Sequence, residues 1–322
     1  MFTVGLLIAS ISGLSEAEIR RQLVEEEERA VKSGARTMVH NISAISMLII
    51  GLDLEEQQWV LVFLTAHGVL LNSSCRALLQ REVRGTAQQT RMYEQRTSFH
   101  RRLKNFRQIQ TLYMPIVCQK VAKDPSSTEA PQLIEKTPLY LPSSLSPADR
   151  LIGCTIGLAG AELNLRQAQC RDALEQLRTM IHIRARLIQY KRYDVRHVGP
   201  NTRCNELIVN HEARITRVAD KYRRARKAVF ALAGTGPWES ELRELRVEDL
   251  RGLQDDDPET VKRKEEQMWK RRKKNKLSTP AEGNRVQSWI WSGVSNGDKP
   301  YDDSEYWVCL YFHVLHLILC VF

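Results

Sequence analysis

The chain has 322 residues, 43% of them hydrophobic and 27% charged, which is the composition of a globular protein and argues against a largely disordered one. Its formal net charge of +10 predicts a surface that attracts polyanions, among which nucleic acid is the commonest partner. The seven cysteines are odd in number and none stands at CxxC spacing, which argues against a disulfide framework and against a zinc site.

The first predicted element is a helix from Ser15 to about Ser33. Ser15 and Glu18 form an S-x-x-E capping box, and Gly34 supplies the stop. The four adjacent glutamates of residues 25–28 point in different directions around this helix. We therefore interpret them as a solvated face rather than as a site.

Two further helices are expected before the first linker. Residues 42–71 are strongly apolar but interrupted by charges, which predicts a buried helix that begins near Asp53 or Glu55, with Asp53 as its N-cap. Residues 86–113 carry an apolar stripe at helical spacing, which predicts an amphipathic helix that ends before Pro115. The stripe consists of Met92, Phe99, Leu103, Phe106, Ile109 and Tyr113.

Prolines that alternate with serine and threonine mark residues 122–147 as a linker, where we place a domain boundary. The predicted division is an N-terminal helical region (1–121), this linker (122–147), a long helical hairpin (148–253), and a charged helix with a mostly disordered tail (254–322). Both ends of the chain are apolar, but the first lacks a positively charged start and the last is shorter than the roughly 20 residues that span a bilayer. We expect no membrane partner.

The predicted fold class is all-α, dominated by a long, coiled-coil-like antiparallel hairpin. Its helices are expected from about 147 to 190 and from about 201 to 232, joined by a connection that is too short for another arrangement. Glycines within residues 153–160 are expected to weaken or break the first helix near its start. The two apolar seams are Leu163, Cys170, Leu174, Leu177, Ile181 and Ile188, and then Ile208, His211, Ile215, Val218, Tyr222, Ala225, Val229 and Leu232. His211 is alone on its seam, so we interpret it as a packed residue rather than a metal ligand.

Basic residues beside the second seam are the main functional signal. Between Arg184 and Lys227 there are 13 Lys and Arg against 4 Asp and Glu. A rigid helix that holds guanidinium groups along one side can neutralise a row of phosphates, although such residues also keep a helical hairpin soluble. The candidate nucleic-acid-binding residues are Arg214, Arg217, Lys221, Arg223, Arg224 and Lys227, and Arg226 widens the patch.

A second basic cluster lies in a charged helix that is expected over residues 259–276. Its run Lys270, Arg271, Arg272, Lys273 and Lys274 is typical of a nuclear localisation signal, the alternative being an ordinary basic linker. We therefore expect a nuclear protein. Residues 277–322 are expected to be largely irregular.

The sequence lacks the motifs that mark catalysis. It contains no GxxxxGK[ST] phosphate loop, no GxSxG elbow, no HExxH and no GxGxxG. We therefore predict no catalytic residue, no metal, no cofactor, no small-molecule substrate and no enzyme activity. A metal-dependent nuclease would need carboxylates that are distant in sequence to meet in the fold.

Seven short phrases stand in a particular order along the chain. They are Leu14–Leu23, Leu112–Pro115, Leu141–Leu145, Ala168–Leu174, Asn201–Arg203, Glu248–Leu253 and Ser288–Trp291. The ordered set resembles the C-terminal region of the fungal Kyakuja-Dileera-Zisupton (KDZ) transposase-like proteins over roughly residues 14–292. Members of that family usually continue into another long helix, whereas residues 292–322 look unrelated here and residues 255–276 look inserted.

The resemblance implies a function in DNA transposition without catalysis in this part of the chain. In that family an RNase H-like nuclease core lies upstream of this region, so no catalytic residue is carried over. The implied function is a helical accessory region that contacts DNA non-specifically or packs on an upstream transposase domain. The alternative is a structural coiled-coil module that pairs with a helical partner chain and binds no nucleic acid.

Overall fold

The computed structural model describes residues 14–35, 40–70, 86–123, 134–193, 195–252 and 288–292, and all regular structure within these ranges is helical. This confirms the all-α prediction. The α-helices are α1 (Glu16–Lys32), α2 (Ala44–Leu70), α4 (Thr86–Tyr113), α5 (Ile116–Lys123), α6 (Pro147–Gly153), α7 (Leu158–Tyr193), α8 (Val198–Ala233) and α9 (Trp238–Glu241). Short 3₁₀ turns are η2 (Ile134–Lys136), η3 (Pro142–Ser144) and η5 (Trp289–Trp291). The chain divides into two compact units, residues 1–247 and 248–322.

Helix α1 begins and ends as its sequence predicts. The backbone N–H of Glu18 donates to Ser15 Oγ at 3.3 Å, and the Ser15 N–H donates to Glu18 Oε2 at 2.8 Å, which completes the capping box. Gly34 follows the helix with φ of +74°, a conformation in which other residues are strained. A cap of this kind contributes about 1 kcal/mol of helix stability.

Helix α2 begins earlier than predicted, and Asp53 is not its N-cap. The helix starts at Ala44 and runs through Asp53, whose carboxylate accepts a hydrogen bond from Arg20 at 2.8 Å. The first turn of α2 is satisfied by two side chains: Ser43 Oγ accepts the Ser46 N–H at 3.1 Å, and the buried Glu27 of α1 accepts the Ile45 N–H at 3.2 Å. The prediction of a solvated face over residues 25–28 is therefore wrong for Glu27, since a tertiary contact draws this one glutamate inward.

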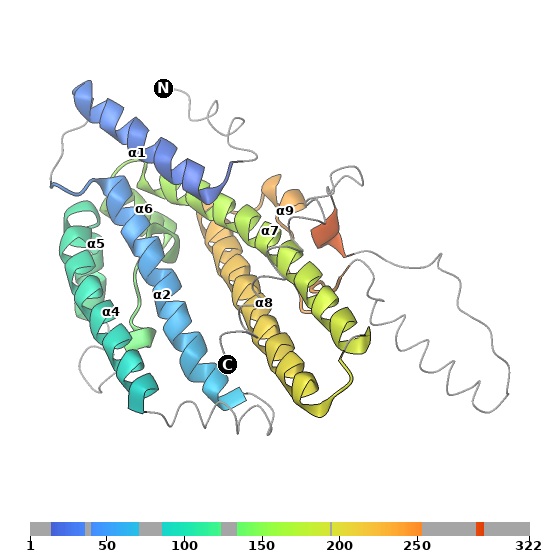
Figure 1. The fold of residues 1–322 in the computed structure, drawn as a ribbon. Helices are drawn as coiled ribbons and strands as arrows, with labels where there is room; N and C mark the ends of the chain where they lie inside the picture. The colour runs from blue at the N-terminus through green and yellow to red at the C-terminus, as the bar shows by residue number, and fades with distance from the viewer. Residues whose placement is uncertain are drawn as a thin grey trace. The chain divides into compact units, whose positions relative to one another are not determined.

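Helix α4 confirms the predicted amphipathic stripe. The stripe residues from Phe99 to Tyr113 are buried and Met92 is half-buried, α4 packs against α2, and the Tyr113 hydroxyl donates to the Ile42 carbonyl at 2.6 Å. Helix α2 packs closely against Leu141 at Gly51, where an added Cβ would lie 2.7 Å from Leu141 Cδ2. Figure 1 shows α2 and α4 side by side, with α1 running from α7 past the start of α2.

The described part of the predicted linker, residues 134–147, packs into the core. Leu139, Leu141 and Leu145 are buried in the same apolar cluster as Leu48 of α2 and Leu165 of α7. The helices on either side of this segment therefore belong to one compact unit, residues 1–247. Prolines and serines interrupt the helices here, but the leucines between them still bury their side chains.

Helices α7 and α8 form the predicted hairpin, each 36 residues long. The predicted first helix is interrupted between α6 and α7, where Gly157 adopts a φ of +89°, as the glycines of this segment predict. The central seam residues, from Cys170 to Ile181 on α7 and from His211 to Val229 on α8, are buried. Ile188 is exposed instead, and Leu165 rather than Leu163 is fully buried.

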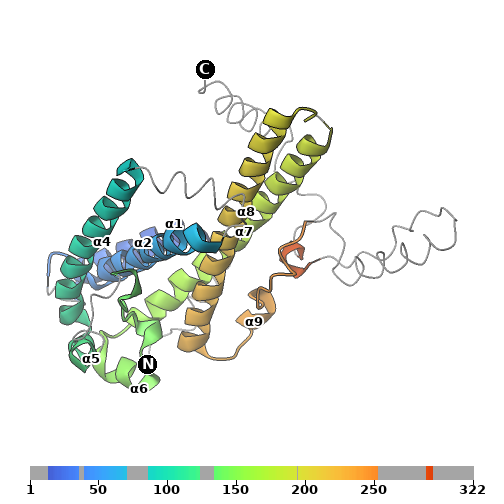
Figure 2. The ribbon, with the colours of Figure 1, turned by 90° about the horizontal axis from the view of Figure 1, so that it is seen from below.

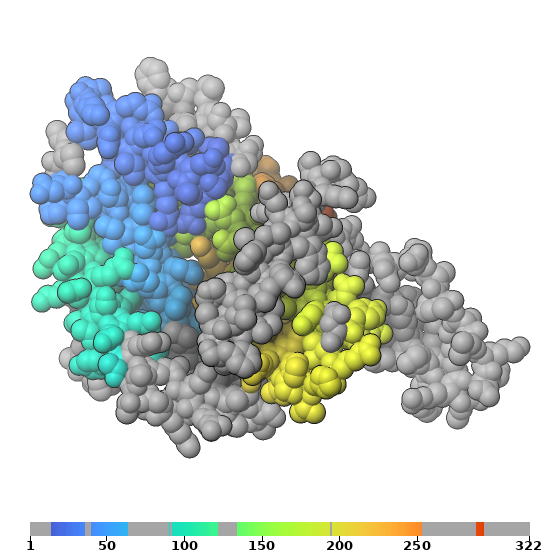
Figure 3. Space-filling view, viewed as in Figure 1, coloured from blue at the N-terminus to red at the C-terminus, as the bar shows by residue number. Residues whose placement is uncertain are grey.

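Two parts of the hairpin differ in burial, and we name them separately. The base comprises residues 158–181 and 211–233, and the loop end comprises residues 182–193 and 195–210. Within the described residues of the loop end, Cys204 alone is buried. In Figure 2 the loop end extends past α1, α2 and α4, and in Figure 3 it forms the yellow surface.

The second unit is described over residues 248–252 and 288–292. Ser288 Oγ donates to the Asp249 carbonyl at 2.9 Å, and the Trp291 indole N–H donates to the Arg251 carbonyl at 3.0 Å. These bonds join two stretches that are distant in sequence. The charged helix predicted over 259–276 and most of the tail predicted to be irregular lie outside the described residues.

Candidate functional site

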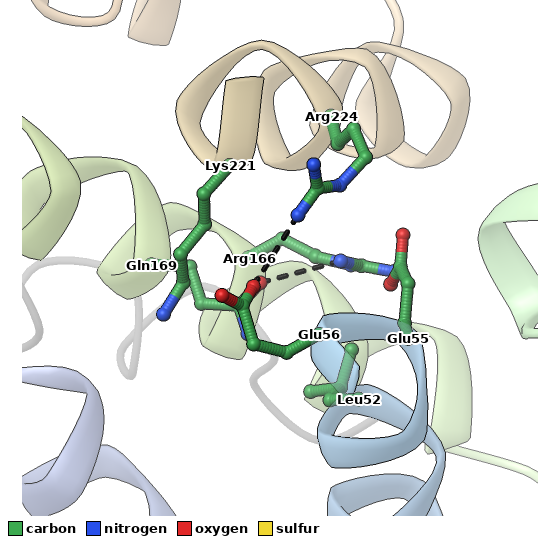
Figure 4. Close-up of a pocket in the computed structure, with 7 residues that line it drawn as sticks. All are labelled: Leu52, Glu55, Glu56, Arg166, Gln169, Lys221 and Arg224. Carbon is green, nitrogen blue, oxygen red and sulfur yellow. Dashed lines mark hydrogen bonds and ion pairs between the residues drawn. The ribbon is translucent and has the colours of Figure 1, made fainter. Parts of the chain in front are cut away.

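Charged and amide side chains from four helices gather where α1 and α2 meet the base of the hairpin. We call this set the interhelical charge network, and Figure 4 shows its central part. It consists of Glu16 and Arg20 from α1, Asp53, Glu55 and Glu56 from α2, Glu162, Arg166 and Gln169 from α7, and Lys221 and Arg224 from α8. With five acids and four bases, the network is close to electrically neutral.

Arg166 lies at the centre of the network and is only 4% exposed. Its guanidinium contacts Glu55 at 2.5 Å and Glu162 at 3.2 Å, and donates to the Gln169 amide oxygen at 3.3 Å. Burial alone lowers the pKa of Arg166, but the two carboxylates outweigh it and the net shift is upward. Glu162 also accepts from the backbone N–H of Ser143 at 2.8 Å, which ties α7 to the segment before α6.

Glu16 joins the network to α1. It lies 2.6 Å from Arg20 and 3.6 Å from Lys221, and accepts from the Gln169 amide at 3.1 Å. Burial raises the pKa of Glu16, but Lys221, Gln169 and Arg20 together outweigh burial, so its pKa is lowered. The first turn of α1 is therefore held on the hairpin by an ionised carboxylate.

Arg224 connects α8 to α2. Its guanidinium lies 3.3 Å from Glu56 and 4.2 Å from the centre of the Trp59 ring, a cation–π geometry. Burial lowers the pKa of Arg224, and Glu56 and Glu55 partly oppose that shift. This arginine covers Trp59 and is turned toward protein rather than solvent.

The space among these side chains is small. The cavity lined by Leu52, Glu55, Arg166 and Arg224 has a volume of about 10 Å³, which is room for about one water molecule. Every basic member of the network already has a carboxylate partner. The arrangement can hold four helices together, but it offers a ligand little volume and no unpaired basic group.

The structure divides the predicted nucleic-acid-binding residues into two groups. Lys221 and Arg224 belong to the charge network, and Arg223 pairs with Asp220 at 2.8 Å while also donating to the Leu245 carbonyl at 3.0 Å. Arg226 donates to the Leu242 carbonyl at 2.9 Å. The outward-facing group is Arg214, Arg217 and Lys227, of which Arg214 and Lys227 are exposed and Arg217 is half-buried. In the part of the chain that the structure describes, Arg214 and Arg217 have no carboxylate partner.

Two titratable groups on the buried seam are held neutral. Burial lowers the pKa of His211, whose Nε2 lies 2.8 Å from the Met180 carbonyl, and burial raises the pKa of Cys170 to about 12. His211 is thus a packed residue, as its place on the seam predicts. The run from Lys270 to Lys274, predicted as a localisation signal, lies outside the described residues.

Sequence reasoning missed the charge network. A weak signal was present, because Glu162, Arg166 and Gln169 repeat at helical spacing along α7 next to its apolar seam. That spacing is equally typical of a solvated face, and only the packing of α1 and α2 on α7 decides between the two.

The described ranges contain no group of three or more His, Cys, Asp or Glu side chains placed to hold a metal ion, and no helix long and apolar enough to cross a membrane. Comparison of the chain with family models, curated proteins and solved structures finds no match.

Proposed function

We propose that this chain is a non-catalytic, helical accessory region of a KDZ transposase-like protein, which contacts DNA non-specifically through outward-facing basic residues of its hairpin. The observation that supports this most directly is the pair Arg214 and Arg217, one turn apart on α8 and without a carboxylate partner among the described residues. A net charge of +10 over the chain adds long-range attraction for a polyanion.

The internal pairing of Lys221, Arg223 and Arg224 refines this proposal. Arginines that are already engaged by carboxylates or carbonyls contribute little to phosphate binding, because each contact would first have to be broken. DNA contact therefore falls to Arg214, Arg217 and Lys227, and to the basic residues of the loop end. Nuclear localisation through Lys270–Lys274 belongs to the same proposal.

Fluorescence anisotropy with a labelled DNA duplex tests the proposal. The full chain should bind at ~50 mM salt, and log K should fall linearly with log salt, by about 0.9 for each phosphate contact. Changing Arg214→Ala together with Arg217→Ala should reduce the magnitude of that slope by up to about 2. Absence of duplex binding at ~50 mM salt would rule out the DNA function.

A matched control removes the same charge elsewhere. Arg21 and Lys32 on α1 are more than two-thirds exposed and pair only weakly with glutamates one turn away. Arg21→Ala with Lys32→Ala should leave the salt slope almost unchanged. If both double variants lower affinity equally, binding depends on net charge rather than on the hairpin.

A second candidate function is assembly with another protein chain, and a separate observation favours it. Leu151 and Ile152 of α6 are 86% and 84% exposed, so two large aliphatic side chains lie next to each other on the surface. Light scattering over a range of protein concentrations tests this function. Growth in mass that is lost on Leu151→Ser with Ile152→Ser, without DNA affinity, would favour assembly over DNA contact.

A further inference from the structure

The loop end of the hairpin exposes aromatic rings as well as basic groups. Tyr190 and Tyr193, on the last turn of α7, are 47% and 62% exposed. Residues three apart on a helix are neighbours on its surface, with about 5–6 Å between their Cβ atoms. The two rings therefore form one aromatic surface near the end of α7.

Positive charge surrounds these rings. Residues 182–210 contain six Lys or Arg against two Asp or Glu. The Arg192 guanidinium lies 5.9 Å from the centre of the Tyr193 ring and covers one face of it, while Arg196 of the connection and Arg203 of α8 are exposed. The loop end is thus complementary to a polyanion and also presents flat rings.

We propose that the loop end binds single-stranded nucleic acid, with Tyr190 and Tyr193 stacking on unpaired bases and Arg192, Arg196 and Arg203 contacting the backbone. This inference rests on the proposed DNA function and names the form of nucleic acid that the loop end would bind. Base faces are buried inside a duplex, so exposed rings gain contact only with bases that are unpaired. Phosphate-binding arginines, by contrast, serve either form.

The burial pattern supports a ligand at this place. A two-helix hairpin buries a single seam, and in the described loop end that seam has one buried residue, Cys204, beside half-buried ones such as Leu187 and Ile208. The tyrosines therefore do not complete a core within the hairpin. The loop end also lies away from α1, α2 and α4 (Figure 2).

The test compares three labelled probes on the full chain by anisotropy: an oligothymidylate of about 20 nucleotides, an abasic strand of the same length, and a duplex, with length chosen to exceed a typical site of about 4–16 nucleotides. The oligothymidylate should bind at least about tenfold more tightly than the abasic strand, since each stacked base contributes roughly that factor. Equal binding of these two single strands would overturn the inference, because they differ only in their bases.

Variants assign the stacking to the two rings. Tyr190→Ala with Tyr193→Ala should weaken oligothymidylate binding roughly tenfold or more for each ring, while duplex binding changes less than about threefold. Tyr190→Phe with Tyr193→Phe should retain binding because the rings remain. Tyr93→Ala, a tyrosine of α4 that is 73% exposed, is the matched control and should change neither affinity. Unchanged oligothymidylate binding by the double Ala variant would overturn the inference.

The outcomes separate this inference from the proposed function. If the chain binds duplex but shows no dependence on bases or on the tyrosines, the single-strand inference fails and the proposed function stands. If no probe binds at ~50 mM salt, both fail. Flotation with phosphatidylserine vesicles covers the other polyanionic surface: vesicle binding that needs the tyrosines, without oligothymidylate binding, would assign the tip to a membrane and overturn the inference.

Discussion

The base and the loop end of the hairpin are built from the same two helices, yet they differ in what covers them. At the base, α1, α2 and the segment around η3 pack on α7 and α8, and the seam residues are buried from Cys170 to Ile181 and from His211 to Val229. At the loop end no such cover is seen among the described residues. The same hairpin is therefore enclosed by other helices at its base and more exposed at its loop end, within the described residues.

Their charges differ in the same way. At the base, carboxylates from α1 and α2 meet the basic side chains of α7 and α8, so Arg166, Lys221 and Arg224 are neutralised within the protein. At the loop end the chain supplies few carboxylates, and the basic residues remain in excess. A row of arginines along a helix therefore predicts a binding surface only where no acidic helix packs against it.

The largest expected effect comes from breaking the charge network at its centre. Arg166→Ala removes the partner of two carboxylates, Glu162 and Glu55, and leaves the fully buried Glu162 without its ion pair. Loss of one member of a buried pair costs about 3–5 kcal/mol. Urea unfolding followed by circular dichroism should show a loss of that size in the free energy of unfolding.

The matched change at the loop end is Arg203→Ala, which removes an exposed arginine. Exposed substitutions usually change stability by less than about 0.5 kcal/mol. If Arg166→Ala were equally mild, the network would be a loose surface cluster, and the contrast between the two regions would be lost.

A second prediction concerns two glycines on either side of the break between α6 and α7. An alanine Cβ at Gly153 would lie 2.4 Å from Cβ of Ile116, whereas at Gly160 it would meet no atom within 4 Å. Gly153→Ala should cost about 1–3 kcal/mol through overpacking. Gly160→Ala should stabilise by up to about 1 kcal/mol, because alanine is the better helix former. Thermal unfolding of both variants measures the two changes in stability, which should have opposite signs. If both changes had the same sign, close packing against α5 would not be what requires glycine at position 153.

The helices of the fold could be predicted from sequence where a local signal determines them. The capping box at Ser15, the stripe from Phe99 to Tyr113 and the long seams on α7 and α8 are patterns within single segments. The start of α2 was missed although it has a local signal, the N-cap Ser43, whose Oγ accepts the Ser46 N–H; the second partner of its first turn, Glu27 of another helix, could not be predicted. Asp53 was mistaken for an N-cap because, in sequence, a carboxylate that pairs with a distant arginine resembles one that begins a helix.

The candidate site was harder to predict than the fold. Arg214, Arg217, Lys221 and Arg224 repeat regularly along α8, and this spacing places them on one side of the helix. It does not say which part of that side meets α1 and α2, and this contact removes Lys221 and Arg224 from the surface. The exposed tyrosines of the loop end, Tyr190 and Tyr193, gave no sequence signal, since exposed and buried tyrosines cannot be told apart until the packing of the hairpin is known.

A smaller loss of stability is expected at low pH, and it arises where α1 packs on the base of the hairpin. The pKa of Glu16 is lowered in the folded state, so its contribution to stability is fully present above the ordinary value of 4.5 and is lost as pH falls through the lower folded value. Glu16→Gln should therefore be less stable than the original chain at neutral pH. Urea unfolding from pH 7 down to pH 3 should show this difference shrinking; a difference that grows on acidification would contradict the ionised state of Glu16.

The smallest expected effect is also the most demanding test of the contrast. Tyr190→Ala with Tyr193→Ala should change the free energy of unfolding by less than about 0.5 kcal/mol, because neither ring fills a core. If these rings instead contributed 2 kcal/mol or more, as buried aromatic side chains do, the loop end would be a packed extension of the base. Urea unfolding of the double variant beside Tyr93→Ala decides the point. A side chain that is exposed, costs nothing to remove and still controls affinity for single strands can act only through what it binds.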